Sequence, residues 1–128
     1  MKIGFIIPTT SAKRNWNNIN DIYLYSITLK SFLITYDKEH KYKFYIGIDL
    51  DDKIFNNKQI IANFNRFINI MQNVEIEFIH LKNIRKGHLT KMWNILFKKA
   101  YDEKCDYFYQ CGDDIEFTTK GWINECIK

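Results

Sequence analysis

The chain has 128 residues, which is enough for one hydrophobic core and too few for two separate domains. Hydrophobic residues make up 46% and charged residues 27%, as in an ordinary soluble globular protein. The formal net charge of +4 favours an anionic ligand. No long block of like charges occurs in the sequence, so nucleic-acid binding is not implied.

The cysteines argue against a disulfide framework and against a structural zinc site. There are three, Cys105, Cys111 and Cys126, and none forms a C-x-x-C pair. The apolar run at the amino terminus is too short for a signal peptide, and no segment approaches the length of a membrane span. We therefore expect a single domain over residues 1–128, cytoplasmic and without a membrane span.

Four short apolar runs alternate with helical patterns along the chain. Near-continuous apolar runs of this length are typical of parallel strands that are covered on both faces. The expected strands cover residues 2–7, 42–48, 74–81 and 106–111.

Three amphipathic helices are expected between these strands. Apolar residues recur at intervals of three and four from Ile22 to Tyr36, from Ile60 to Met71, and from about His88 to Ala100. A further helix is expected to begin near Lys120. Alternating strands and helices imply right-handed crossovers. The expected fold class is therefore α/β, a doubly wound and mostly parallel sheet with helices on both faces.

Polar residues follow each expected strand, at the edge where ligands bind in sheets of this kind. The first loop combines hydroxyl groups, the third is basic, and the second and fourth are acidic. The candidate residues are Pro8, Thr9, Thr10 and Ser11; Asp49 and Asp51; Arg85 and Lys86; and Asp113 and Asp114.

The last of these loops indicates a divalent metal. The adjacent carboxylates of Asp113 and Asp114 repel each other unless a cation lies beside them. Hard carboxylate oxygens select Mg²⁺ or Mn²⁺, which commonly complete their shells with phosphate oxygens. Arg85 and Lys86 are the expected phosphate partners, with Gly87 allowing close backbone approach. An acidic turn and an exposed basic loop are the alternatives for these two segments.

The second loop suggests contacts to a nucleoside. Asp49 ends a strand, where its carboxylate can accept a hydrogen bond from a base N–H, and Asp51 either reaches a ribose or forms a turn. The first strand is followed by no G-x-G-x-x-G, and the chain has no P-loop signature, so a dinucleotide cofactor and a P-loop protein are not expected.

Several of these segments resemble the amino-terminal half of GT-A glycosyltransferases, especially the family-2-like group. They are Ile6-Ile7-Pro8-Thr9-Thr10, the strand ending at Asp49, the basic loop that leads into a helix with Asn94, and the run from Tyr107 to Asp114. The likeness covers nearly the whole chain, although each motif is only moderately specific.

The resemblance implies a role for each matching residue. Pro8, Thr9 and Asp49 would contact the nucleoside, and Arg85 or Lys86 would face the nucleotide. Asp114 would be the principal metal ligand, with Asp113 toward the ribose or the metal. Gly112 replaces the first acid of the family's D-x-D motif, which leaves the role of Asp113 less defined.

The activity implied is metal-dependent transfer of a sugar from a UDP- or GDP-sugar to an unknown acceptor. The family places its catalytic base well downstream of the metal motif, whereas Glu116 and Glu125 are the only acids after Asp114 here, and neither occupies that position. The catalytic base is therefore not identified. The chain is expected to be a fragment, a half that needs a homodimer or a partner domain, or a binding domain without turnover.

Two other functions remain open from the sequence. One is a degenerate, non-catalytic domain that binds a nucleotide sugar. The other is a nucleotidyltransferase, which needs a glycine-rich basic loop after the first strand. Residues 9–12 contain no glycine, although Lys13 and Arg14 follow them, so this alternative is the weaker one.

Overall fold

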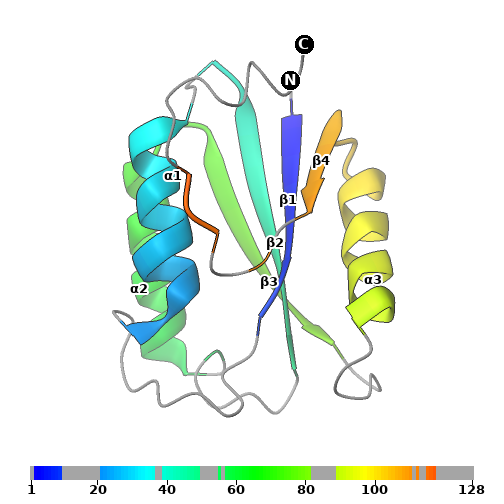
Figure 1. Cartoon of the computed structure of the whole chain (residues 1–128), viewed down its shortest axis with the longest axis horizontal. Helices are drawn as coiled ribbons and strands as arrows, with labels where there is room; N and C mark the ends of the chain where they lie inside the picture. The colour runs from blue at the N-terminus through cyan, green and yellow to red at the C-terminus, as the bar shows by residue number, and fades with distance from the viewer. Residues whose placement is uncertain are drawn as a thin grey trace.

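A computed structural model of the chain describes residues 2–9, 21–36, 39–49, 55, 57–81, 89–110, 112 and 115–117. Its centre is a four-stranded parallel sheet with the strand order β3-β2-β1-β4 (Figure 1). The strands are β1 (Lys2–Pro8), β2 (Lys41–Asp49), β3 (Val74–Leu81) and β4 (Tyr107–Gln110). The helical segments are η2 (Leu24–Leu29), α1 (Lys30–Thr35), α2 (Lys58–Ile70) and α3 (Leu89–Asp102).

The sheet is doubly wound, as the alternation of strands and helices predicts. Figure 1 shows α1 and α2 on one face of the sheet and α3 on the other. From β1 the chain moves to β2 and then to β3 in one direction, and then crosses back to place β4 on the far side of β1. Right-handed crossovers in opposite directions put their helices on opposite faces. The α/β fold class is confirmed.

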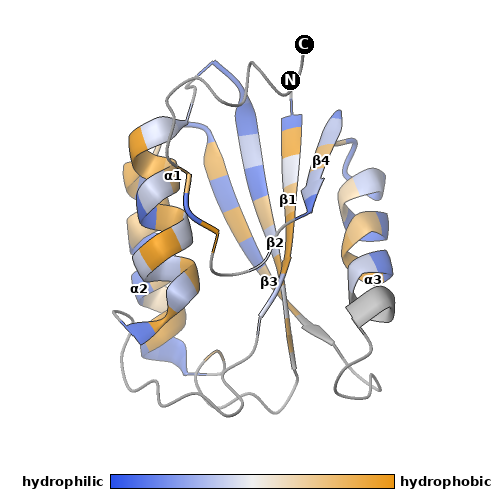
Figure 2. Ribbon diagram, in the orientation of Figure 1, coloured by the Kyte–Doolittle hydropathy of each residue, from blue (hydrophilic) through white to orange (hydrophobic). Residues whose placement is uncertain are grey.

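The strand β1 is the buried centre of this sheet. It pairs with β2 from Lys2 opposite Lys41 to Pro8 opposite Gly47, and with β4 from Ile3 to Ile6. Every side chain from Ile3 to Ile7 is buried, which accounts for the apolar run in the sequence. Figure 2 shows orange along most of β1 and alternating orange and blue along β2 and β3, which are less covered on the α3 face.

Aromatic rings fill the core between the sheet and α1. The Phe5 ring stacks on Phe44 with centroids 4.7 Å apart, and Phe32 of α1 meets both rings edge-on at 5.4 and 5.1 Å. Offset stacks and edge-on contacts are the arrangements that aromatic quadrupoles favour. After β4, residues 115–117 lie against α1, where the Phe117 backbone N–H donates to Ser31 Oγ at 2.9 Å.

The first helical segment differs from the expected single α-helix. Its apolar stripe is confirmed, since Ile22, Leu29 and Phe32 are fully buried. However, Leu24–Leu29 is wound as a π-helix before α1 begins. The wider π turn repeats about every five residues, so that both Leu24 and Leu29 are buried.

The fourth strand also differs from expectation, because it is not covered on both faces. Tyr107 and Phe108 are 40% and 38% exposed, and Tyr109 is half-buried against Phe5. Within the described part of the chain β4 pairs only with β1, so it is a short edge strand. An apolar run therefore marked the strand correctly but gave the wrong burial.

The described helices include none that is both long enough and apolar enough to cross a membrane.

The closeness of α3 to β1 gives a test of the packing. A Cβ at Gly4 would lie 3.1 Å from Cys105 Sγ, 3.3 Å from the Tyr45 ring and 3.5 Å from Ala100 Cβ. We expect Gly4→Ala to lower the free energy of unfolding by about 1–3 kcal/mol, because overpacking forces these neighbours to shift.

Urea denaturation of Gly4→Ala, Cys105→Ala and the double variant measures the coupling between the two positions. The double variant should lose less stability than the sum of the single variants, since Cys105→Ala removes the closest atom. Strict additivity would contradict the proposed contact.

Candidate functional site

The carboxyl ends of all four strands lie at one edge of the sheet, because every pairing is parallel. At this edge Thr9 follows β1 and is only 4% exposed. Its backbone N–H donates to the Gly47 carbonyl at 2.9 Å, which extends the β1–β2 ladder by one residue. Thr9 is thus held in a fixed position where β1 leaves the sheet.

The winding direction reverses between β1 and β4, and ligands in open α/β sheets bind at such a reversal. Gly112 follows Gln110, whose Cα partner on β1 is Ile6. Thr9 and Gly112 therefore follow two adjacent strands on either side of the reversal. This is the edge at which the sequence predicts a ligand site.

The structure describes only some of the predicted site residues. Pro8 is half-buried, Thr9 is buried, and the backbone of Asp49 ends β2. The Asp49 side chain lies outside the described part, as do Thr10, Ser11, Asp51, Arg85, Lys86, Asp113 and Asp114. Their placement in one cleft remains a prediction. Among the described residues there is no group of three or more His, Cys, Asp or Glu side chains arranged to hold a metal ion.

A buried indole lies on the α3 side of the sheet. The helix α3 runs from the carboxyl end of β3 to the amino end of β4, and its Leu96 and Ala100 pack on Ile6 and Tyr45. Trp93, one turn before Leu96, is therefore nearer to the carboxyl edge. Its Nε1 is buried and has no hydrogen-bond partner in the described structure. A buried donor without a partner costs about 1–3 kcal/mol of stability.

A network of charged side chains connects α3 with β2 and β3 near the other end of the sheet. Lys43 Nζ lies 2.7 Å from Glu103 Oε1 and 2.9 Å from Glu77 Oε1. Lys99 Nζ lies 3.2 Å from the second oxygen of Glu77. The Tyr45 hydroxyl donates to Glu103 Oε1 at 2.7 Å. Glu103 therefore links the end of α3 to β2, and Lys43 and Lys99 extend the network to Glu77 on β3.

Burial and hydrogen bonding shift the pKa values of this network. Burial lowers the pKa of Lys43, but hydrogen bonds with Glu103 and Glu77 outweigh this and hold it above 10.5. The hydrogen bond from Lys43 lowers the pKa of Glu103 below 4.5, against the effect of burial. Burial raises the pKa of Tyr45, and its contacts with Cys105 and Glu103 act in the same direction. All three groups keep their ordinary neutral-pH charge states, so the network fastens α3 to the sheet.

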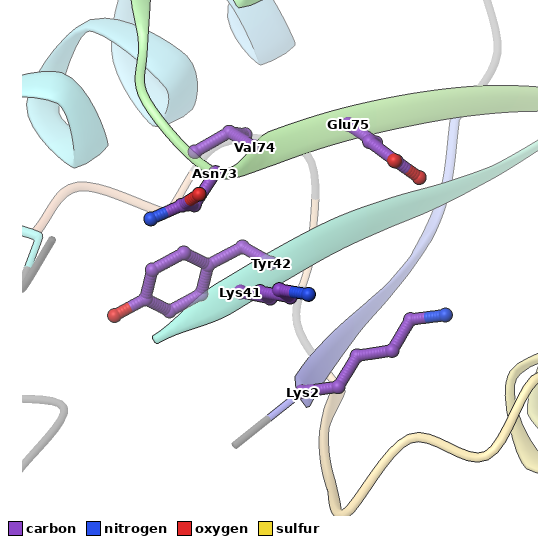
Figure 3. Close-up of a pocket in the computed structure, with 6 residues that line it drawn as sticks. All are labelled: Lys2, Lys41, Tyr42, Asn73, Val74 and Glu75. Carbon is purple, nitrogen blue, oxygen red and sulfur yellow. The ribbon is translucent and has the colours of Figure 1, made fainter. Parts of the chain in front are cut away.

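A notch lies at the amino edge, opposite to the predicted site. It has a volume of about 470 Å³. Figure 3 shows its lining, which comes from β1, β2 and the start of β3. The lining residues are Lys2, Lys41, Tyr42, Asn73, Val74 and Glu75. No sequence pattern indicates this notch, because its lining residues meet only through the register of β1, β2 and β3.

Comparison with models of protein families, with curated proteins and with solved structures found no match for this chain.

The role of Glu103 gives a prediction about acid stability. Because its pKa is lower in the folded protein than the reference value of 4.5, its stabilising effect is present above pH 4.5 and is lost as pH falls through the folded value. We expect Glu103→Gln to cost about 1 kcal/mol at neutral pH, allowing for its partial exposure, and to flatten the fall in stability below pH 4.5.

Urea denaturation measures both effects when it is repeated from about pH 3 to about pH 7, a range that includes the usual pKa values of carboxyl groups. The control is Glu75→Gln, which changes an exposed glutamate on the same sheet. An equal flattening in both variants would contradict a specific role for Glu103.

Proposed function

We propose that this chain binds a nucleotide-diphosphate sugar through a divalent metal at the carboxyl edge, and that it acts as the donor-binding part of a glycosyltransferase. The observation that supports this most is the reversal of winding between β1 and β4. It sets the end of β1, with Thr9, beside the end of β4, after which Asp113 and Asp114 follow Gly112 in sequence.

The donor chemistry of the four loops fits one ligand with a base, a sugar and two phosphates. Asp113 and Asp114 supply hard carboxylate oxygens, which suit Mg²⁺ or Mn²⁺. Arg85 and Lys86 supply cations for the phosphates, and they precede α3 directly in sequence. These loops follow strands of one parallel sheet, whose carboxyl ends share an edge, and this shared edge supports the proposal that one ligand contacts them all.

In this proposal each group of residues contacts a different part of the nucleotide sugar. Pro8, Thr9 and Asp49 hold the nucleoside, with Thr10, Ser11 and Asp51 beside it. Asp113 orients the ribose or shares the metal with Asp114. When bound, the metal supplies positive charge that stabilises the leaving diphosphate. Arg85 and Lys86 bind and orient the same phosphates, which leaves the anomeric carbon accessible to an acceptor hydroxyl. The proposal does not specify the acceptor, the catalytic base, the nucleobase or the donor sugar.

Ligand-induced stabilisation tests the metal role of Asp114. Binding to the folded state alone raises the melting temperature, by about 5–10 °C for a chain of this size at a ligand concentration near 100 times the dissociation constant. We expect UDP or GDP with Mn²⁺ to produce such a rise, and Asp114→Ala to remove it.

The matched control is Glu116→Ala, which removes an exposed carboxylate two residues further along. It should keep the full shift. If Asp114→Ala and Glu116→Ala respond alike, Asp114 has no metal role. The proposed ligand class would be overturned if UDP and GDP both left the wild-type melting temperature unchanged.

Turnover separates a transferase from a domain that only binds. Incubation with radiolabelled UDP- and GDP-sugars and Mn²⁺ should release nucleotide diphosphate, slowly with water as the acceptor and faster with the natural one. Measurable binding with no release, in the presence of a panel of sugar and alcohol acceptors, would favour the non-catalytic alternative.

A further inference from the structure

The notch at the amino edge has the composition of a second binding site, separate from the proposed donor site. On the side of the sheet that faces α3, the notch is lined by Lys2 of β1, Lys41 of β2 and Glu75 of β3. Figure 3 shows these three side chains pointing to one side of the sheet, whereas Tyr42 and Asn73 point to the other. A volume of about 470 Å³ is within the range of small-molecule pockets.

The two lysines of the notch are placed side by side by the strand register. Lys2 and Lys41 are Cα partners on adjacent strands, so their side chains leave the sheet on the same face at the same level. Like charges in opposed positions of a sheet destabilise it. Lys2 Nζ donates to the Glu103 carbonyl at 3.1 Å, and the Asp106 carboxylate accepts from the Lys2 backbone N–H at 2.8 Å. Within the described residues no carboxylate forms an ion pair with the ammonium group of Lys2 or Lys41.

Lys43, a neighbouring lysine on β2, differs from Lys41 because its charge is neutralised by ion pairs within the protein. Lys43 is two residues further along the same face and contacts two carboxylates, those of Glu103 and Glu77. Glu75 is the register partner of Lys43, yet it makes no ion pair within the described residues. The internal network thus leaves out both Lys41 and Glu75, which line the notch.

We propose that the amino-edge notch binds a small ligand that carries an anionic group beside a hydrogen-bond donor. The ammonium groups of Lys41 and Lys2 hold the anion, which relieves their mutual repulsion. The Glu75 carboxylate accepts from the donor group and so discriminates against simple anions. Phosphate monoesters and carboxylates with an adjacent amine or hydroxyl group have this chemistry.

The test is an NMR titration of the whole ¹⁵N-labelled chain at constant ionic strength. The two probes are 2-aminoethyl phosphate, which has both groups, and sulfate, which is an anion without a donor. We expect saturable shifts of the Lys2, Lys41 and Glu75 amide signals, and tighter binding of 2-aminoethyl phosphate. Because neither probe contains a nucleoside, and because the affected amides lie at the amino edge, this result is independent of the donor site.

Two variants and a control assign the roles. Lys41→Ala should raise the dissociation constants of both probes about tenfold, the usual effect of losing one charge-assisted contact. Glu75→Gln should weaken 2-aminoethyl phosphate alone. Lys98→Ala, which removes an exposed lysine of α3, should change neither value.

Equal effects of Lys41→Ala and Lys98→Ala would overturn the proposal, since they would indicate a general attraction to the positive surface. An absence of shifts at the three notch amides would overturn it as well. Lys41→Gln provides a second variant in case Lys41→Ala disturbs the edge of the sheet.

Discussion

Parallel pairing of β1 on both of its edges is the constraint on which the rest of the structure depends. With β2 on one side and β4 on the other, β1 is buried on both faces, and the chain winds away from it in two directions. This arrangement requires a helix layer on each face, which α1 provides by packing Phe32 on Phe5 and Phe44, and α3 provides by its close approach at Gly4. The same reversal separates the segments that follow β1 and β4 at the carboxyl edge, where open α/β sheets bind ligands. Fold and proposed site thus have one origin.

Local sequence patterns predicted most of this fold because its elements are locally encoded. The apolar runs locate all four strands to within one or two residues, and the stripe of Ile60, Phe64 and Ile68 predicts the buried side of α2. The π-helix was not predicted, because apolar residues at intervals of three and four indicate an ordinary α-helix, whereas Leu24–Leu29 is wound as a π-helix. The burial of β4 was not predictable either, since Tyr107-Phe108-Tyr109 has the composition of a central strand. Its edge position depends on strand order, which no local pattern specifies.

The sites differ in how far the sequence revealed them. The strand boundaries read from the sequence placed Thr9 and Gly112 after β1 and β4, whereas the winding reversal between these strands follows from the observed strand order. The charged network was not predicted, because Lys43, Glu77 and Glu103 are far apart in the chain and meet only through strand register and the end of α3. The amino-edge notch also depends on register, which aligns Lys2 with Lys41. The charged residues at the two edges therefore have different roles. The ion pairs among Lys43, Glu77 and Glu103 hold α3 on the sheet, whereas the loops at the carboxyl edge are proposed to bind a metal and a diphosphate.

Paramagnetic relaxation by Mn²⁺ tests the central claim most directly, because it reports the position of the metal on the sheet. In the ¹⁵N-labelled chain with bound nucleotide diphosphate, substoichiometric Mn²⁺ should broaden the amide signals of Thr9, Gly112 and Ile115. The amides of Lys41 and Val74 should stay sharp, because β2 has 9 residues and at about 3.3 Å per residue it separates the two edges by roughly 26 Å. Selective broadening of Lys41 and Val74, or uniform broadening along β1 and β2, would contradict a metal site at the winding reversal.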